Sequence, residues 1–165
     1  MSRGFTVAEL VTVLAIVAVL AAVALPLVLA SLPGYRLRAA ARELVIDFKK
    51  AKVEAIKRNR DVLIVFSPNP AVNPHPANEP HADYVLCVDA DRSSVCDANE
   101  ERIARVAMPR DVRLTAPNFS NTNTCGYDPR GMPWRNRWGR VDVATADDSR
   151  SHRISLSRNG AVRLQ

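Results

Sequence analysis

Apolar and polar positions divide the chain into a membrane-like segment, an amphipathic segment and a β-like remainder. Residues 10–30 carry no charge over 21 positions, and Thr12 is their only polar residue. At about 1.5 Å per residue an α-helix of this length spans roughly 31 Å, which is enough to cross a bilayer core. A cleaved signal peptide has a shorter apolar region of about 7–15 residues. The pattern therefore predicts a retained membrane helix, which Pro26 is expected to kink.

An amphipathic helix is predicted for residues 35–60, after a second weak point at Pro33-Gly34 that is expected to be a bend or a short melted stretch. Apolar residues recur there at three- and four-residue steps: Leu37, Ala40, Ala41, Leu44, Phe48, Ala51, Ala55 and Ile56. Asp47 and the basic residues of this segment are assigned to the solvent-exposed face. Because an apolar stripe has to be buried, we expect it to pack on a β-sheet formed by the rest of the chain.

The remainder of the chain has a strand-like pattern. Alternating or continuous apolar runs predict strands at residues 62–66, 84–88, 102–106, 112–115, 138–143, 152–156 and 161–164. Five prolines among residues 67–81 predict a loop, and Asn159-Gly160 predicts the turn of a closing hairpin. The predicted fold is α+β, with a long N-terminal helix, half membrane and half amphipathic, packed on a small antiparallel β-sheet head.

The charge of the chain is basic, with a formal net charge of +6 and no lysine after Lys57. An arginine-rich exterior favours anionic partners such as lipid headgroups, nucleic acid or acidic faces of neighbouring subunits, and it also fits simple solubility. Residues 131–140 interleave tryptophan with arginine, which suits stacking on bases or anchoring a loop to the core. The candidate DNA contacts are Arg135, Arg137, Arg140, Arg158 and Arg163.

Candidate chemistry is sparse. Cys87, Cys96 and Cys125 form no CxxC pair, so no zinc site is expected. In an oxidising compartment two of them should pair, and the sequence leaves all three pairings open. The aspartates at 89, 91 and 97 are interpreted as an ordinary acidic turn. The spacing of the histidines, serines and cysteines forms no catalytic constellation, so we expect no enzymatic activity, no cofactor and no metal.

The N-terminus carries a recognisable motif. Residues 3–10 read RGFTVAEL, which resembles the class III signal of type IV pilins and pseudopilins. In that signal a short basic leader ends in glycine and is followed by phenylalanine. A carboxylate is the fifth residue after the cut, and a proline stands at the twenty-second. Glu9 and Pro26 occupy these positions if the cut lies between Gly4 and Phe5.

The rest of the chain resembles the FimT/GspH branch of minor pilins and pseudopilins. The segments that carry this resemblance read YVLCVDAD at 84–91, YDPRG at 127–131 and ISLSRNGAVR at 154–163. The DNA-binding subset of the family is associated with a G-R-x-R ending. This chain reads GAVR at 160–163 and lacks the first arginine of that motif.

The resemblance implies that a prepilin peptidase cuts after Gly4 and that the new amine of Phe5 is methylated. Glu9 would then neutralise this amine, either within one subunit or between neighbouring subunits, and serve assembly. The implied organisation is a leader at 1–4, a transmembrane and assembly helix at 5–34, and a head at 35–165 with its amphipathic helix at 35–60. The implied location is the bacterial inner membrane, single-pass, with the head in the periplasm before incorporation into a filament.

The resulting hypothesis is a non-enzymatic minor pilin or pseudopilin that helps initiate or cap a type II secretion pseudopilus or a type IV pilus. Its partners would be other pilins, the prepilin peptidase, the inner-membrane assembly platform and the membrane. The alternative hypothesis is a FimT-like minor pilin that binds DNA during natural transformation. One rule disagrees with this orientation, because basic residues are denser after the span than before it, which by itself would place the head in the cytoplasm.

Overall fold

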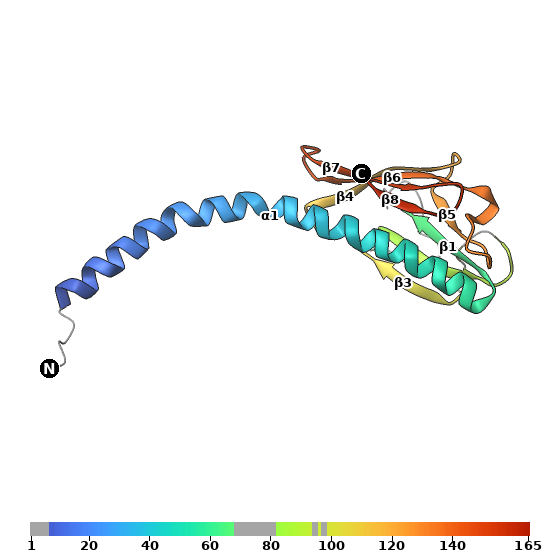
Figure 1. The fold of residues 1–165 in the computed structure, drawn as a ribbon, viewed down its shortest axis with the longest axis horizontal. Coiled ribbons are helices and arrows are strands. Elements are labelled where there is room, and N and C mark those ends of the chain that lie inside the picture. Colours follow the sequence, from blue (N-terminus) through green and yellow to red (C-terminus); the bar gives the residue numbers. More distant parts are fainter. Residues whose placement is uncertain (1–6, 68–81, 94–95, 97–98) are drawn as a thin grey trace.

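A computed structural model describes residues 7–67, 82–93, 96 and 99–165. One long helix, α1 (Val7–Arg58), projects from a β-rich head, and its C-terminal half lies along that head (Figure 1). Most of the loop predicted at 67–81 lies outside the described residues, as do two of the histidines and Asp97.

Helix α1 is continuous over 52 residues, although it contains Pro26, Pro33 and Gly34. A melted stretch at Pro33-Gly34, one of the two forms expected of this weak point, was therefore wrong, and a bend there stays a prediction. A proline costs the helix one hydrogen bond, and the bonds on either side can hold the backbone helical. The helix is bowed along its length (Figure 1), as long helices commonly are. A kink local to Pro26 stays a prediction.

Eight strands form two antiparallel four-stranded sheets among the described residues. The first has the order β3-β2-β1-β5, with bounds Arg102–Val106, Tyr84–Asp89, Asp61–Phe66 and Thr124–Tyr127. The second has the order β4-β6-β7-β8, with bounds Val112–Phe119, Gly139–Thr145, Ser151–Leu156 and Val162–Leu164. A short 3₁₀ helix, η1 (Trp134–Asn136), follows β5. The predicted α+β fold is confirmed, and its head contains two sheets where one was expected.

The hydrophobic core lies between α1 and the inner faces of both sheets. Phe48 is at its centre, with ring centroids 6.3 Å from Phe66 and 6.2 Å from Phe119. The predicted stripe on α1 is buried from Leu37 to Ala55, while Ile56 at its end is 51% exposed. The apolar periodicity of the sequence therefore positioned the helix correctly on the head.

Asp47 corrects the predicted exposed face of α1. Its side chain is 8% exposed and accepts a hydrogen bond of 2.6 Å from the hydroxyl of Tyr84 on β2. A buried carboxylate needs such a donor, because burial without one is costly. The residue is a polar link between helix and sheet and has no role in solvation of the helix.

Candidate functional site

The N-terminal half of α1 presents an apolar surface that the head leaves uncovered. Residues Val7–Leu25 have a mean hydropathy of 2.7, and the chain buries 0% of this segment. By length and composition it is the one helix segment among the described residues that can cross a membrane. Exposing so many aliphatic side chains to water is unfavourable, so this surface requires lipid or the helices of neighbouring subunits.

Glu9 lies in the first described turn of α1. A carboxylate is favourable there, because the backbone amides at a helix N-terminus carry partial positive charge. Gly4 and Phe5, where cleavage and methylation are predicted, lie outside the described residues. The pairing of Glu9 with a new amine at Phe5 therefore stays a prediction.

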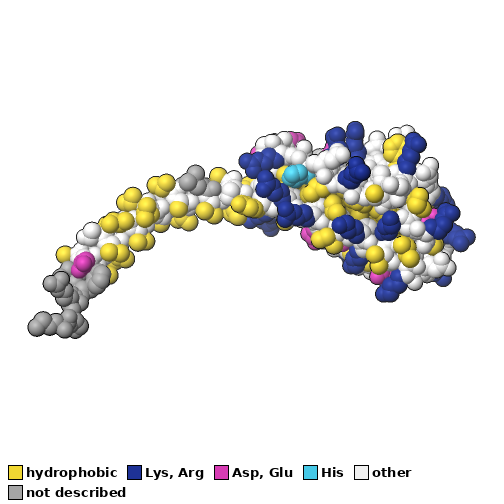
Figure 2. Space-filling model, viewed as in Figure 1, with side chains coloured by type: hydrophobic (Ala, Val, Ile, Leu, Met, Phe, Trp, Pro, Cys, Tyr) yellow, Lys and Arg dark blue, Asp and Glu magenta, His cyan; other side chains and the backbone are white. Residues whose placement is uncertain are grey.

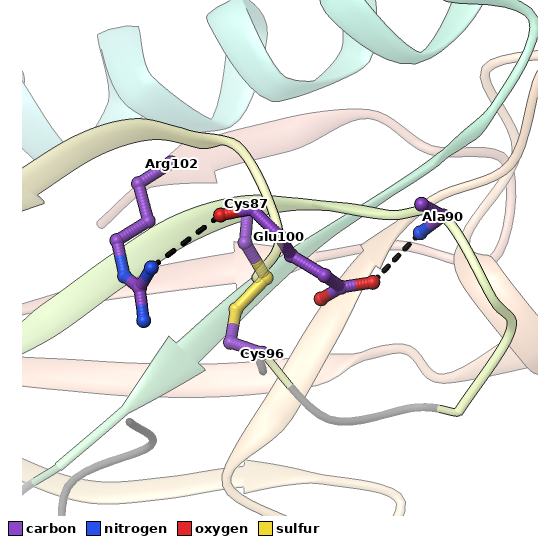
Figure 3. Close-up of a disulfide and its surroundings, with 5 residues drawn as sticks. All are labelled: Cys87, Ala90, Cys96, Glu100 and Arg102. Atoms are coloured by element: carbon purple, nitrogen blue, oxygen red, sulfur yellow. Dashed lines mark hydrogen bonds between the residues drawn. A yellow bond between two sulfur atoms is a disulfide. The ribbon is translucent and has the colours of Figure 1, made fainter. Parts of the chain in front are cut away.

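The structure selects one cysteine pairing of the three that the sequence allowed. Cys87 on β2 is bonded to Cys96 in the segment that leads to β3, and Figure 3 shows this bond spanning the β2–β3 connection. Glu100 supports the same connection by accepting a hydrogen bond of 2.7 Å from the amide of Ala90. Cys125 on β5 is a buried free cysteine, and burial raises the pKa of its thiol.

The acidic turn after β2 brings three carboxylates together. Ligand atoms of Asp89, Asp91 and Glu100 lie within 4.8 Å of one another. Asp91 accepts a hydrogen bond of 2.8 Å from the amide of Ser93, and this bond lowers the pKa of Asp91. Asp91 and Glu100 thus act as acceptors for backbone amides of the turn, as in other turns rich in aspartate.

The two tryptophans of residues 131–140 have different environments. Trp134 is 2% exposed and packs on the outer face of the first sheet beside the disulfide. Its indole nitrogen donates to Asp61 at 3.2 Å. The guanidinium groups of Arg135 and Arg137 lie 4.9 and 4.7 Å from its ring centroid. Burial lowers the pKa of Arg137. Trp134 anchors the loop, and both guanidinium groups pack against its ring.

The outer face of the second sheet gathers the other candidate arginines. Strand register places Arg163 beside Ser155, Ser155 beside Arg140, and Arg140 beside Asn118. This row borders an open hollow of about 660 Å³ that Trp138 also lines. Trp138 is 40% exposed, and the guanidinium of Arg158 lies 4.6 Å from its ring centroid.

Sequence reasoning missed the polar neighbours of these arginines. The place of Ser155 on this face could have been predicted from the two-residue period of β7. The place of Asn118 could not, because the β4–β6 pairing shifts register between Thr115 and Asn118. Pro117 lies in this irregularity, the usual place for a proline within a sheet. Arg153 shares this outer face, but its guanidinium is bound to Asp142 at 2.7 and 3.0 Å.

Comparison with known proteins identifies the class. The family described as type II transport protein GspH matches residues 40–160. The pilin-like protein PilA1 of Thermus thermophilus is 31% identical over 169 residues, covering 99% of this chain and 98% of the relative. The chain belongs to the GspH family of the type IV pilins and pseudopilins.

A solved structure shows the same fold. The minor pseudopilin EpsH from the type 2 secretion system of Vibrio cholerae superimposes with a TM-score of 0.53 at 10% identity, covering 79% of this chain and 96% of that one. The type IV minor pilin FimU of Pseudomonas aeruginosa (strain PAO1) gives a TM-score of 0.47 at 14% identity, covering 78% and 91%. This protein is accordingly a minor pilin or pseudopilin of type II secretion or a type IV pilus, a structural subunit without enzymatic activity.

Proposed function

We propose that this subunit helps initiate or cap a filament of pilins, in a type II secretion pseudopilus or a type IV pilus. The observation that supports a place in such a filament is the long apolar surface of Val7–Leu25, of which this chain buries 0%. Lipid covers this surface while the subunit is in the membrane, and the helices of other subunits cover it in a filament. The proposed organisation is a leader at 1–4, a membrane and assembly helix at 5–34, and a periplasmic head at 35–165.

Assembly would depend on Glu9. Prepilin peptidase would cut between Gly4 and Phe5, and the methylated amine of Phe5 would provide a positive charge one helical turn from the carboxylate. An unpaired carboxylate among packed apolar helices is costly, and an ammonium partner offsets that cost. A subunit at the filament tip can pair Glu9 with its own amine, and a subunit within the filament can pair it with the amine of a neighbour.

The test compares Glu9→Gln with the native full chain in cells that assemble the filament. We expect the variant to be cut after Gly4 as the native chain is, as shown by mass spectrometry, and to be depleted from sheared filaments. Thr12→Val is the matched control, because it removes a polar group from the same helix without removing a charge. Normal incorporation of Glu9→Gln would contradict the role of the carboxylate.

The outer face of the second sheet favours a second candidate function, binding of DNA. Its support is the row containing Arg140 and Arg163, which lies beside the exposed Trp138 and its stacked Arg158. Guanidinium groups contact phosphates, and an exposed indole can stack on a base. Arg135 lines a second hollow together with Arg158, so it can extend this surface.

Salt dependence tests the second function. The full chain in detergent micelles is titrated with duplex DNA at several salt concentrations. Arg140→Gln/Arg163→Gln should reduce the slope of log affinity against log salt by about 2, because the slope falls by about 0.9 for each phosphate that the protein no longer neutralises. Arg60→Gln/Arg92→Gln removes equal charge elsewhere on the head and should leave the slope unchanged. Absence of a gel shift at low salt would eliminate this function.

A further inference from the structure

Three segments distant in sequence meet where α1 enters the head. Arg36 on α1 forms an ion pair with Asp111, in the connection between β3 and β4. The carbonyl of Asp111 accepts a hydrogen bond of 2.9 Å from Ala146, in the connection between β6 and β7. Arg150 of that same connection packs against Gly34, where its guanidinium nitrogen lies 2.5 Å from the position that a Cβ would occupy. Gly34 therefore makes room for Arg150 at the base of the head.

We propose that this base binds the headgroups of anionic phospholipids. The surface consists of Arg36, Arg38, Arg110 and Arg150, which we name the basic collar. Within the described part of the chain, the ion pairs include Arg36 and none of the other three collar arginines. Lys and Arg side chains gather at this junction in Figure 2.

The nearby acids leave the collar positive. Asp111 is paired with Arg36, and Asp148 with Arg113. Asp147 accepts hydrogen bonds from the amide and hydroxyl of Ser149. Its negative charge offsets part of the positive charge of the collar. An excess of guanidinium groups remains, and guanidinium is the side-chain group best suited to paired hydrogen bonds with phosphate oxygens.

The depth of the collar matches that of lipid phosphates. The uncharged run ends at Ala30, and α1 continues without a break, so Arg36 and Arg38 lie about 9 and 12 Å further along the helix axis. The polar layer on each side of a bilayer is roughly 5–8 Å thick. Helical side chains lean toward the N-terminus, and arginine extends its charged end to an interface. The guanidinium groups therefore reach back to the phosphate layer.

This position favours lipid over a soluble polyanion, which would have to enter the gap between head and bilayer. The inference goes beyond filament assembly, but it rests on the proposed membrane anchoring. It also gives a role to basic residues on the flank where the positive-inside rule does not expect them. Basic residues next to a span draw anionic lipids to it.

The test measures lipid retention by the full chain in non-ionic detergent. The protein is mixed with equal amounts of phosphatidylglycerol and phosphatidylcholine, and native mass spectrometry counts each bound lipid. We expect the native chain to prefer phosphatidylglycerol. Arg38→Gln/Arg150→Gln should lower that preference by about fivefold for each arginine removed. Arg60→Gln/Arg92→Gln is the matched control, since it removes the same charge at the opposite end of the head.

Each outcome is decisive. Equal loss in both double variants, or a native chain that binds both lipids without preference, would overturn the collar and leave membrane anchoring intact. A native chain that binds neither lipid would overturn the anchoring as well. If the collar variant loses affinity for another filament subunit while its lipid preference is unchanged, the collar is a protein contact and the proposal fails. Thermal unfolding confirms that each variant is folded.

Discussion

Replacing Tyr84 by phenylalanine should weaken the attachment of α1 to the head. The hydroxyl of Tyr84 donates to Asp47 at 2.6 Å and so joins β2 to the helix inside the core. Tyr84 is 0% exposed and Asp47 is 8% exposed, so water cannot easily replace the lost donor. A hydrogen bond to a charged acceptor contributes about 1.5–3 kcal/mol, and we expect Tyr84→Phe to lower the free energy of unfolding by that amount.

The same bond predicts a pH dependence. Burial, followed by the hydrogen bond to Asp47, raises the pKa of Tyr84 above its ordinary value of 10.0. A folded-state pKa above the unfolded one gives stability that is fully present below pH 10.0 and is lost as the pH rises beyond it. The stability of the native chain should therefore fall more steeply above this pH than that of Tyr84→Phe.

The assay is denaturant unfolding of the full chain in detergent micelles, followed by near-ultraviolet circular dichroism. Tyr127→Phe is the control, because the hydroxyl of Tyr127 donates to the neutral carbonyl of Gly160 at a longer distance of 3.5 Å. We expect that variant to lose less than about 1 kcal/mol. Equal losses in the two variants, or a loss for Tyr84→Phe below about 0.5 kcal/mol, would refute the reasoning.

Further perturbations probe the core, the disulfide and an acidic turn. Phe48→Ala should cost about 3–5 kcal/mol in denaturant unfolding, because it empties the centre of the aromatic cluster; a loss below about 1.5 kcal/mol, half the lower bound, would show that the cluster repacks. Cys87→Ala/Cys96→Ala should cost about 2–3 kcal/mol, since the bond closes a loop with a sequence separation of 9; thermal unfolding of the native chain should then respond to reductant, and insensitivity would contradict the bond. Hydrogen bonds from Thr145 and Ser149 lower the pKa of Asp147 to about 2. The folding stability that these bonds contribute is therefore present above pH 3.8 and is lost as the pH falls toward 2. In an acid titration of the free energy of unfolding, Asp147→Asn should lose less stability in this window than the native chain, and an equal loss would contradict the reasoning.

The helix was largely predictable from the sequence, because burial against a sheet imposes a simple period. The three- and four-residue steps from Leu37 to Ala55 identified the buried face. The exceptions depend on tertiary contacts. Asp47 is buried because Tyr84 supplies a donor from a strand 37 positions away, and no local pattern indicates that partner.

Seven of the eight described strands coincide with predicted ones, and β5 was missed. Strand β5 has four residues and includes Gly126, which lacks a side chain to mark the pattern. A Cβ at Gly126 would lie 2.2 Å from the carbonyl oxygen of Val62, so this glycine allows β5 to approach β1 closely. The division into two sheets depends on pairings between distant strands, which periodicity does not reveal.

For the candidate DNA surface, too, the sequence indicated some features and could not indicate others. Composition made residues 131–140 a candidate for DNA contact, which stays a prediction, and it could not separate the buried Trp134 from the exposed Trp138. Their different roles follow from Asp61, which lies 73 positions from Trp134 and accepts its indole hydrogen. Arg140 and Arg163 become neighbours of Ser155 only through strand register.

The continuity of α1 has a mechanical consequence. Because α1 is helical from Val7 to Arg58, a pull on the apolar end is transmitted to the head along one continuous backbone. Withdrawing the stalk from the bilayer by one helical turn lifts the head by about 5.4 Å, and twisting the stalk turns the head through the same angle. The rotational orientation of the head about the axis of α1, and so the side that it turns toward its neighbours, is then set by contacts of the distant stalk.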